Sequence, residues 1–246
     1  MSDRRITRLY LDRDLGADRA PLTERETKYL GSVLRLKRGD HVLAFNGRGQ
    51  ERFAAIASLA RAQGELALLD FVDPLPESKL ALTLVQALPK TEAMDLVVQK
   101  ATELGVRALW PVTSDFSVVR LDPERAERRA VHWRRIAQSA CEQSGRHRPP
   151  EIRAVQPLAQ CLEQIPTDST RIVLDPRADA PLSSAEPPTG DLFLMIGPEG
   201  GFSEADLERI ERHGVRRMRL GPRTLRAETA AIAAAGIAQA LWGDLR

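Results

Sequence analysis

Cysteine and histidine are scarce in this 246-residue chain, and their scarcity argues against several kinds of site. The two cysteines, Cys141 and Cys161, are far apart and fit no metal-binding or redox spacing. The four histidines are scattered and form no ligand pair. We therefore expect no metal site and a reducing compartment.

Long apolar segments are also missing. No apolar run approaches the ~20 residues of a membrane span, and the amino-terminal segment MSDRRITRLYLDRD is too charged for a signal peptide. We therefore expect a cytoplasmic protein with no membrane association. An apolar content of 43% is enough to fill a core, and the length allows one large domain or two modest ones.

Lysine is rare among the basic residues. Lysine and arginine together number 36, but lysine occurs only at positions 28, 37, 79, 90 and 100. The planar guanidinium of arginine suits phosphate groups and base edges, which favours a nucleic-acid partner. A GC-rich genome would produce the same bias, so composition alone leaves both explanations open.

A change of pattern near residues 70–79, DFVDPLPESK, divides the chain. Before it, short strand-like segments surround one helix that begins with a capping box from Thr23 to Glu26. This half predicts a small β-barrel domain over 1–73, with strands at 6–11, 41–46, 51–60 and 65–72 and a helix at 23–36.

After the boundary, strands and helices alternate, which predicts an α/β domain over 79–246 with a parallel sheet covered on both faces. The strands are predicted at 80–88, 106–112, 151–155, 171–175, 191–197 and 216–221. The helices are predicted at 91–104, 122–143, 157–165, 203–214 and 227–242.

The segment 191–206, DLFLMIGPEGGFSEAD, reads as strand, glycine-rich loop and helix, with Ser203 and Asp206 as a capping pair. Its glycines leave room for a ligand or another backbone to approach closely. The Walker lysine and the G-x-G-x-x-G order are both missing. Acidic residues at the start of the helix, among them Glu199 and Glu204, would repel a phosphate. The loop therefore favours a neutral or cationic ligand, and a tight turn without any ligand is the alternative.

A second loop repeats this arrangement in RMRLGPRTLRAETA, residues 217–230. We interpret the two segments as neighbouring parallel strands whose loops meet at the carboxyl edge of one sheet, where open α/β sheets bind ligands. Arg226 and Glu228 in this loop could meet a substrate. An ordinary ion pair at the start of a helix is the alternative.

Together, IGPEGGFSEAD and LGPRTLRAETAAIAA resemble the signature of the SPOUT superfamily of S-adenosylmethionine-dependent RNA methyltransferases. Within it the sequence resembles most closely the RsmE family, which methylates N3 of a uridine in bacterial 16S ribosomal RNA. The resemblance extends to three further segments: RLYL…LGSVLRLKRGD, QALPKTEAMDLVVQKATELGV and WRRIAQSACEQSGRHRPPEI.

The resemblance implies an amino-terminal PUA-like RNA-binding barrel and a carboxy-terminal α/β SPOUT domain with a deep trefoil knot. It also implies S-adenosylmethionine as cofactor, 16S rRNA in the 30S subunit as substrate, and a homodimer. The alanine-rich helix at 227–242 is compatible with close packing between subunits, or simply with packing inside one subunit.

Carried over by position, the resemblance places the cofactor at the ends of three strands. The expected cofactor-binding residues are Leu174, Asp175, Ile196, Gly197, Glu199, Gly200, Gly201, Leu220, Gly221, Arg223, Thr224 and Leu225. The sequence departs from the family at Ala93, where relatives often carry a lysine.

Methylation of uracil N3 requires loss of the imide proton. The protein must therefore position the base against the methyl group, remove the N3 proton and stabilise the resulting negative charge. We expect Arg226 to stabilise negative charge on the uracil oxygens and Glu228 to orient Arg226 or accept the proton. Alternatively, Glu228 only braces Arg226 or caps the helix.

Residues 120–153 hold nine arginines against five acidic residues and indicate an RNA-binding surface, although arginine-bearing helices are often only solvated. The expected RNA contacts are Arg8, Arg35, Lys37, Arg38, Lys90, Arg134, Arg135, Arg146 and Arg148. Two other functions stay open: a SPOUT methyltransferase of another base or ribose, and a non-catalytic RNA-binding protein of ribosome assembly.

Overall fold

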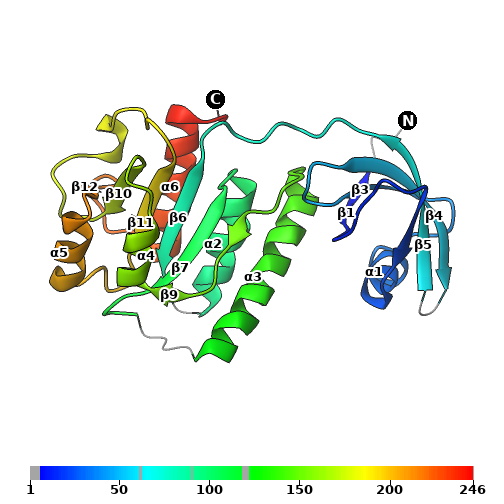
Figure 1. Cartoon of the computed structure of the whole chain (residues 1–246), viewed down its shortest axis with the longest axis horizontal. Helices are drawn as coiled ribbons and strands as arrows, with labels where there is room; N and C mark the ends of the chain where they lie inside the picture. Colours follow the sequence, from blue (N-terminus) through cyan, green and yellow to red (C-terminus); the bar gives the residue numbers. More distant parts are fainter. Residues whose placement is uncertain (1–5, 61–62, 90, 118–121, 246) are drawn as a thin grey trace. The chain divides into compact units, whose positions relative to one another are not determined.

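The structure is a computed structural model that describes residues 6–60, 63–89, 91–117 and 122–245. The chain divides into two compact units (Figure 1). The first comprises Met1–Pro76 and Cys141–Arg148, and the second comprises Glu77–Ala140 and Pro149–Arg246. The segment Cys141–Arg148, which begins with the last four residues of the helix Pro123–Ser144, belongs to the first unit, which no sequence pattern indicated.

The first unit contains a five-stranded sheet in the order β1-β3-β4-β5-β2. Its strands are β1 (Thr7–Tyr10), β2 (Arg19–Leu22), β3 (His41–Phe45), β4 (Glu51–Ala60) and β5 (Gln63–Phe71). β1 pairs with β3 in parallel, and the other pairs are antiparallel. Apolar side chains alternate along β4, so that Ala54 and Ile56 enter the core of this unit, as a half-buried strand requires.

The helix predicted over 23–36 is divided in the structure. It begins as α1 (Glu24–Lys28) and continues as one turn of π-helix, η1 (Tyr29–Val33). The predicted capping box is confirmed: the Glu26 N–H donates to Thr23 Oγ1 at 3.2 Å, and the Thr23 N–H donates to Glu26 Oε2 at 2.7 Å.

The second unit is built on a parallel sheet in the order β12-β10-β11-β6-β7-β8, with β9 also paired to β7. Its strands are β6 (Leu82–Ala87), β7 (Ala108–Thr113), β8 (Glu151–Ile152), β9 (Gln156–Pro157), β10 (Thr170–Leu174), β11 (Leu192–Ile196) and β12 (Arg216–Met218). Its helices are α2 (Thr91–Glu103), α3 (Pro123–Ser144), α4 (Leu158–Gln164), α5 (Glu204–Arg212) and α6 (Ala227–Trp242), with a 3₁₀ turn, η2 (Leu182–Ser184).

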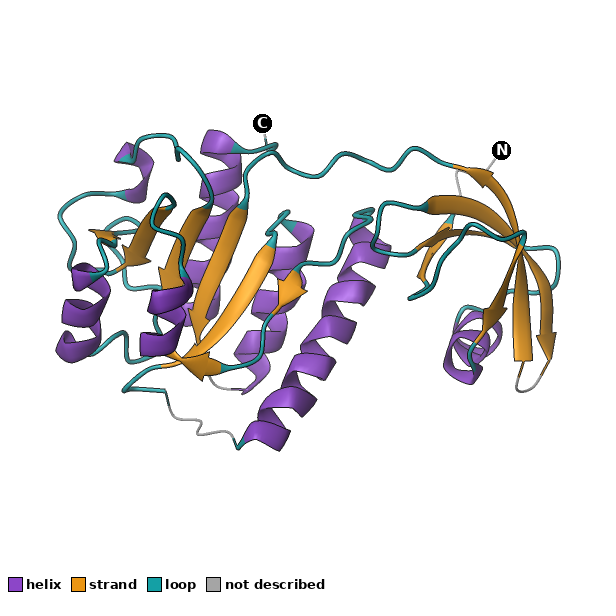
Figure 2. Cartoon of the chain, viewed as in Figure 1, coloured by secondary structure: helices purple, strands orange, loops and turns teal. Residues whose placement is uncertain are grey.

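Helices cover both faces of this sheet (Figure 2). Every residue of β6 and β11 is buried, as expected for central parallel strands. On one face, alternate strand residues such as Leu84 and Leu194 pack with side chains of α2, α3 and α6. On the other face, Phe193 and Met195 pack with side chains of α4 and α5. The predicted two-sided α/β architecture is therefore confirmed.

One expectation about this sheet is wrong. The two strands that lead into the Gly-Pro loops, β11 and β12, are not neighbours, because β10 lies between them and pairs in parallel with both. β10 precedes both strands in the sequence but lies between them in the sheet, so the spatial order differs from the order along the chain. As a result, the end of β10 lies between the two loops at the carboxyl edge.

Helix positions were predicted closely in the second unit, and α6 begins and ends at the predicted residues. The strand predicted over 151–155 shortens to β8, and β9 forms separately after it. Among the described helices, none is long and apolar enough to cross a membrane.

Candidate cofactor site

A cavity of about 590 Å³, counted with its part open to solvent, lies at the carboxyl ends of β10, β11 and β12. Its lining comprises Leu174, Asp175, Pro176, Ile196, Gly197, Pro198, Glu199, Gly201, Leu220, Arg223, Thr224, Leu225, Ala227 and Ala230. All residues expected to bind the cofactor lie in this lining except Gly200 and Gly221.

The loop after β11 is folded tightly on itself. The Gly201 N–H donates to the Pro198 carbonyl at 2.9 Å, and Gly201 has a φ of +73°, which favours glycine. A Cβ at Gly197 would lie 3.1 Å from the Gly201 carbonyl carbon and 3.2 Å from the Phe202 nitrogen. Gly197 is thus required by the loop's own backbone, and it also belongs to the cavity lining.

Asp175 places a carboxylate in the cavity wall and is 5% exposed. Its Oδ1 accepts from the Arg177 backbone N–H at 2.9 Å and from Arg177 Nε at 3.2 Å, and its Oδ2 accepts from Arg217. Arg177 also pairs with Glu204, and Arg217 pairs with Glu211. These ion pairs tie the end of β10 to β12 and to both ends of α5.

The charge network sets the ionisation of Asp175. Burial alone would raise its pKa, but the hydrogen bonds from the backbone and side chain of Arg177, with that from Arg217, lower the pKa below its usual value. Asp175 therefore stays ionised and paired with both arginines. Neither arginine was expected from the sequence, where each resembles an ordinary surface residue.

Replacing Asp175 by asparagine should destabilise the second unit by about 1–3 kcal/mol at neutral pH, because two arginines lose a charged acceptor. A carboxylate whose pKa is lowered by folding stabilises the fold fully above its unfolded pKa of about 3.9, and this contribution is lost as the pH falls through the lower folded value. Urea denaturation of both proteins should thus show a difference that shrinks below about pH 4. A difference independent of pH would contradict the ion-pair explanation.

Arg226 and Glu228 lie at the start of α6. Arg226 is the exposed N-cap residue, and Glu228 is half-buried in the first turn. In the sequence, Arg226 stands between Leu225 and Ala227, both of which line the cavity. Within the described ranges no ion pair joins Arg226 to Glu228, so the structure does not show the helix-start pair that was the alternative interpretation.

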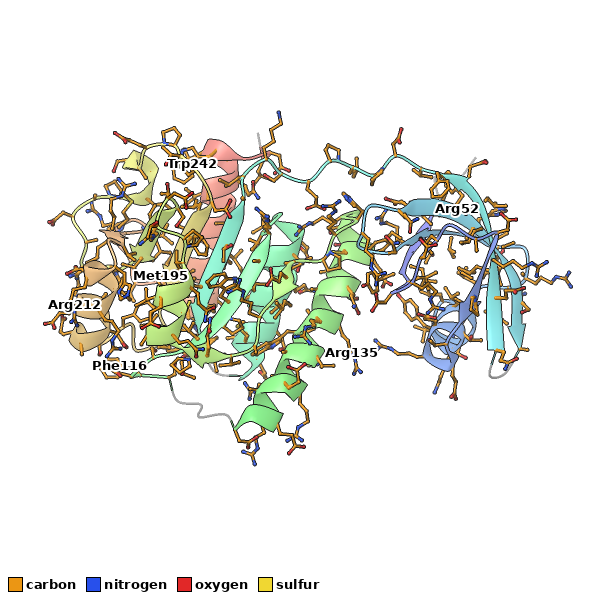
Figure 3. The ribbon with its side chains drawn as sticks, in the orientation of Figure 1. Arg52, Phe116, Arg135, Met195, Arg212 and Trp242 are labelled. Atoms are coloured by element: carbon orange, nitrogen blue, oxygen red, sulfur yellow. The ribbon has the colours of Figure 1, made fainter. Side chains whose placement is uncertain are left out.

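The arginines predicted to contact RNA on α3 differ in their surroundings. Arg134 pairs with Glu127 at 2.9 Å. Arg135 is exposed and projects from α3 (Figure 3). Lys90 lies outside the described residues.

In the first unit, Arg35, Lys37 and Arg38 are exposed, and Lys37 and Arg38 line a hollow together with Lys28. Arg148 is also exposed.

Arg8 occupies an interior position in the same unit. It pairs with the buried Glu51, donates to the Arg146 carbonyl at 3.1 Å, and stacks on the Phe45 ring at 4.8 Å. The position of Arg8 argues against a phosphate contact, because its guanidinium is engaged in holding the unit together. The Arg146 side chain is half-buried.

Within the described parts of the chain, no group of three or more histidine, cysteine, aspartate and glutamate side chains could hold a metal ion.

Two protein families match the chain. The RNA methyltransferase domain family matches residues 76–239, which contain the whole cavity. The RNA methyltransferase PUA domain family matches residues 22–66.

Curated relatives match over most of the chain. The chain is 32% identical over 243 residues to the ribosomal RNA small subunit methyltransferase E of Buchnera aphidicola, covering 98% of this chain and 99% of the relative. It is 30% identical over 218 residues to the protein of the same name from Bacillus subtilis, covering 85% of each.

Solved structures agree with these relatives. A ribosomal RNA small subunit methyltransferase E from Neisseria gonorrhoeae, bound to S-adenosylmethionine, superposes with a TM-score of 0.94 at 34% identity, over 98% of this chain and 100% of that one. A putative methyltransferase from Legionella pneumophila, in complex with the same cofactor, has a TM-score of 0.93 at 34% identity with the same coverage.

Proposed function

Since the chain belongs to the ribosomal RNA small subunit methyltransferase E family, we propose that it methylates N3 of a uridine in 16S ribosomal RNA with S-adenosylmethionine as methyl donor. The observation that carries this proposal is the cavity at the ends of β10, β11 and β12, which gathers nearly all the residues expected to bind the cofactor.

The residues of the cavity fit this cofactor. Glycine and apolar side chains leave backbone N–H and C=O groups accessible, which suits recognition of an adenine. The exposed Glu199 belongs to the lining and suits a cationic sulfonium, whereas the Asp175 carboxylate is already paired with Arg177 and Arg217. When bound, S-adenosylmethionine supplies an electrophilic methyl group.

Side chains of the protein would then accept the N3 proton of the uracil and stabilise the negative charge that its loss leaves on the base. We assign Glu228 as the acceptor of the N3 proton and Arg226 as the cation that stabilises negative charge on the uracil oxygens. The absence of an ion pair between them, within the residues that the structure describes, leaves both side chains available to a substrate. A buried uracil N3 also requires an unpaired or extruded base.

We extend the proposal to the finer architecture. Residues 1–73 would form a PUA-like RNA-binding barrel, and residues 79–246 would form a SPOUT domain with a deep trefoil knot. In support of the knot, the segment between β10 and β11 packs on both β12 and α6: the Leu182 N–H donates to the Arg219 carbonyl at 2.9 Å, and η2 contacts α6. Contacts of this segment with both β12 and α6 are those expected if α6 follows a path enclosed by earlier chain.

A homodimer belongs to the same proposal. In support of it, Gly236 on α6 has open space where a Cβ would lie, so a second helix could approach closely. Sedimentation of the purified protein would measure this state directly. A substrate in the small ribosomal subunit would place the activity in the cytoplasm.

The proposed RNA surface of the first unit includes Lys37 and Arg38, which line a basic hollow. Replacing both by alanine should weaken binding of 16S rRNA at low salt and make the slope of log affinity against log salt shallower by about 1–2, because fewer counterions are released. Fluorescence anisotropy at several salt concentrations would measure both quantities. An unchanged slope would remove these residues from the RNA surface.

The function itself is tested by methyl transfer to 16S rRNA and to 30S subunits from a strain that lacks the modification, followed by mapping of the modified atom. We expect methylation at uridine N3. A methyl group on another base or on a ribose would indicate a different SPOUT activity. No transfer to either substrate, with no heat of S-adenosylmethionine binding in calorimetry, would indicate a non-catalytic RNA-binding protein.

A further inference from the structure

An exposed aromatic ring lies beside the cofactor loop. Phe116, in the turn that follows β7, is 53% exposed, although aromatic residues make up only 4% of the sequence. The carboxyl end of β7 lies at the same edge of the sheet as the cavity, because all strands of this sheet run in parallel. Figure 3 shows Phe116 at this edge.

The turn that carries Phe116 is closed by its own polar groups. The Ser117 N–H donates to the Ser114 carbonyl at 3.0 Å, and the Ser114 N–H donates to Ser117 Oγ at 3.0 Å. The two hydroxyl oxygens lie 3.1 Å apart. Phe116 is therefore held in a tight turn, with its ring outside the hydrogen-bonded part.

The turn is also fixed to the start of α5. The Asp115 N–H donates to the buried Asp206 Oδ2 at 3.0 Å, and Ser203 Oγ donates to Asp115 Oδ2 at 2.6 Å. Ser203 also caps α5, because its Oγ accepts from the Asp206 N–H at 3.0 Å. This cap confirms half of the predicted capping box, while the Asp206 carboxylate bonds to the Phe116 turn instead of returning to Ser203.

Phe116 packs on the face of the glycine loop that does not line the cavity. A Cβ built at Gly200 would lie 3.4 Å from Phe116 Cβ and 3.6 Å from Cδ2 of its ring. Gly200 is absent from the cavity lining, whereas Gly197, Glu199 and Gly201 contribute to it. Phe116 thus lies within van der Waals reach of Gly200, and the same short loop has the cavity on one face and an aromatic ring on the other.

We propose that Phe116 is a stacking platform for a pyrimidine base of single-stranded RNA beside the cofactor site, an inference that rests on the proposed function. Proteins that read unpaired RNA stack its bases on aromatic rings, and a ring needs one face in solvent to do so. A ring on a fixed turn is ordered before the base arrives, which reduces the entropy lost on binding.

The surroundings favour a base over a protein partner. Among the described residues of this turn, those on either side of Phe116, Asp115 and Ser117, are polar and add no apolar surface of the kind that a protein interface would bury. A single planar ring among polar groups suits a single planar base.

The test compares Phe116→Ala, Phe116→Leu and Phe116→Tyr in binding to a fluorescein-labelled oligouridine, measured by anisotropy. Loss of one base–aromatic stack should weaken binding about 5- to 150-fold in the alanine variant. The leucine variant, which keeps apolar bulk without a ring face, should be weakened similarly, and the tyrosine variant should bind like the wild type. Leu96→Ala, at a residue of α2 that is 40% exposed, is the matched control and should bind like the wild type.

Two further measurements separate this role from others. Affinity for S-adenosylmethionine in calorimetry should be unchanged in all variants, because Phe116 lies on the far face of the loop from the cavity. A change of mass in sedimentation for Phe116→Ala would show that the ring contacts a second copy of the chain, which would overturn the proposal. Wild-type binding by the leucine variant, equal binding by all variants, or no binding of oligouridine by the wild type would also overturn it.

The methylation assay distinguishes failure of the proposed stacking platform from failure of the proposed function. If the wild-type protein methylates 16S rRNA and the three variants bind oligouridine equally well, the platform is wrong and the function stands. If the wild-type protein transfers no methyl group, the function fails whatever the binding comparison shows.

Discussion

Arg226→Ala is expected to lower kcat for methyl transfer by about 100-fold or more, the usual effect of removing a group that stabilises transition-state charge. The affinity for S-adenosylmethionine should stay nearly unchanged, because Arg226 is absent from the cavity lining. Single-turnover kinetics with 16S rRNA and calorimetry with the cofactor would measure these two quantities separately. Glu228→Gln should also lower kcat, because the variant lacks the carboxylate assigned as the acceptor of the N3 proton.

Arg223→Ala is the matched control, because Arg223 is an exposed arginine of the same loop that does line the cavity. Its substitution should weaken cofactor binding with a smaller effect on kcat. If Arg226→Ala retains the wild-type kcat, Arg226 has no part in the chemistry. If it loses cofactor affinity as Arg223→Ala does, its role is in binding.

The second large effect is expected from Gly197→Ala, which should weaken S-adenosylmethionine binding by about 100-fold and destabilise the second unit by about 1–3 kcal/mol. The added Cβ would lie 3.1 Å from backbone atoms of Gly201, a contact that no side-chain rotation relieves. The loop would have to shift, and its residues line the cavity. Calorimetry and thermal unfolding would measure the two effects.

Gly200→Ala, in the same loop as Gly197, is the matched control. Its Cβ would lie 3.4 Å from the Phe116 side chain, which can move by a few tenths of an ångström. Cofactor affinity should therefore change by only a few fold. Equal losses in both variants would mean that any added side chain disturbs this loop, and that the backbone contact at Gly197 is not the cause.

Most helices and strands of the second unit could be predicted, because the patterns that specify them lie within short stretches of sequence. The apolar runs of β6 and β11 and the bounds of α6 follow from composition and helix-forming residues. The order of the strands could not be predicted in this way, since the position of β10 between β11 and β12 depends on tertiary packing. The lining of the cavity could be anticipated only through resemblance to a family.

The features that were missed have physical reasons. Strand β2 is four residues long and includes Pro21, which is tolerated because β2 lies at the sheet edge. The π-turn η1 has the periodicity of an ordinary helix and differs only in its bonding, as when the Leu34 N–H donates to the Tyr29 carbonyl at 3.0 Å. Arg217 meets Asp175 only in the folded chain, because 42 positions separate them.

The two faces of the glycine loop have a thermodynamic consequence. Gly200 backs the Phe116 ring, while Gly197 and Gly201 form part of the cavity wall, so a ligand on either face acts on the same few peptide groups. If cofactor binding changes the affinity for RNA by some factor, RNA binding must change the affinity for the cofactor by the same factor. A mutation that changes this coupling should therefore change the effect of each ligand on the affinity for the other by the same factor.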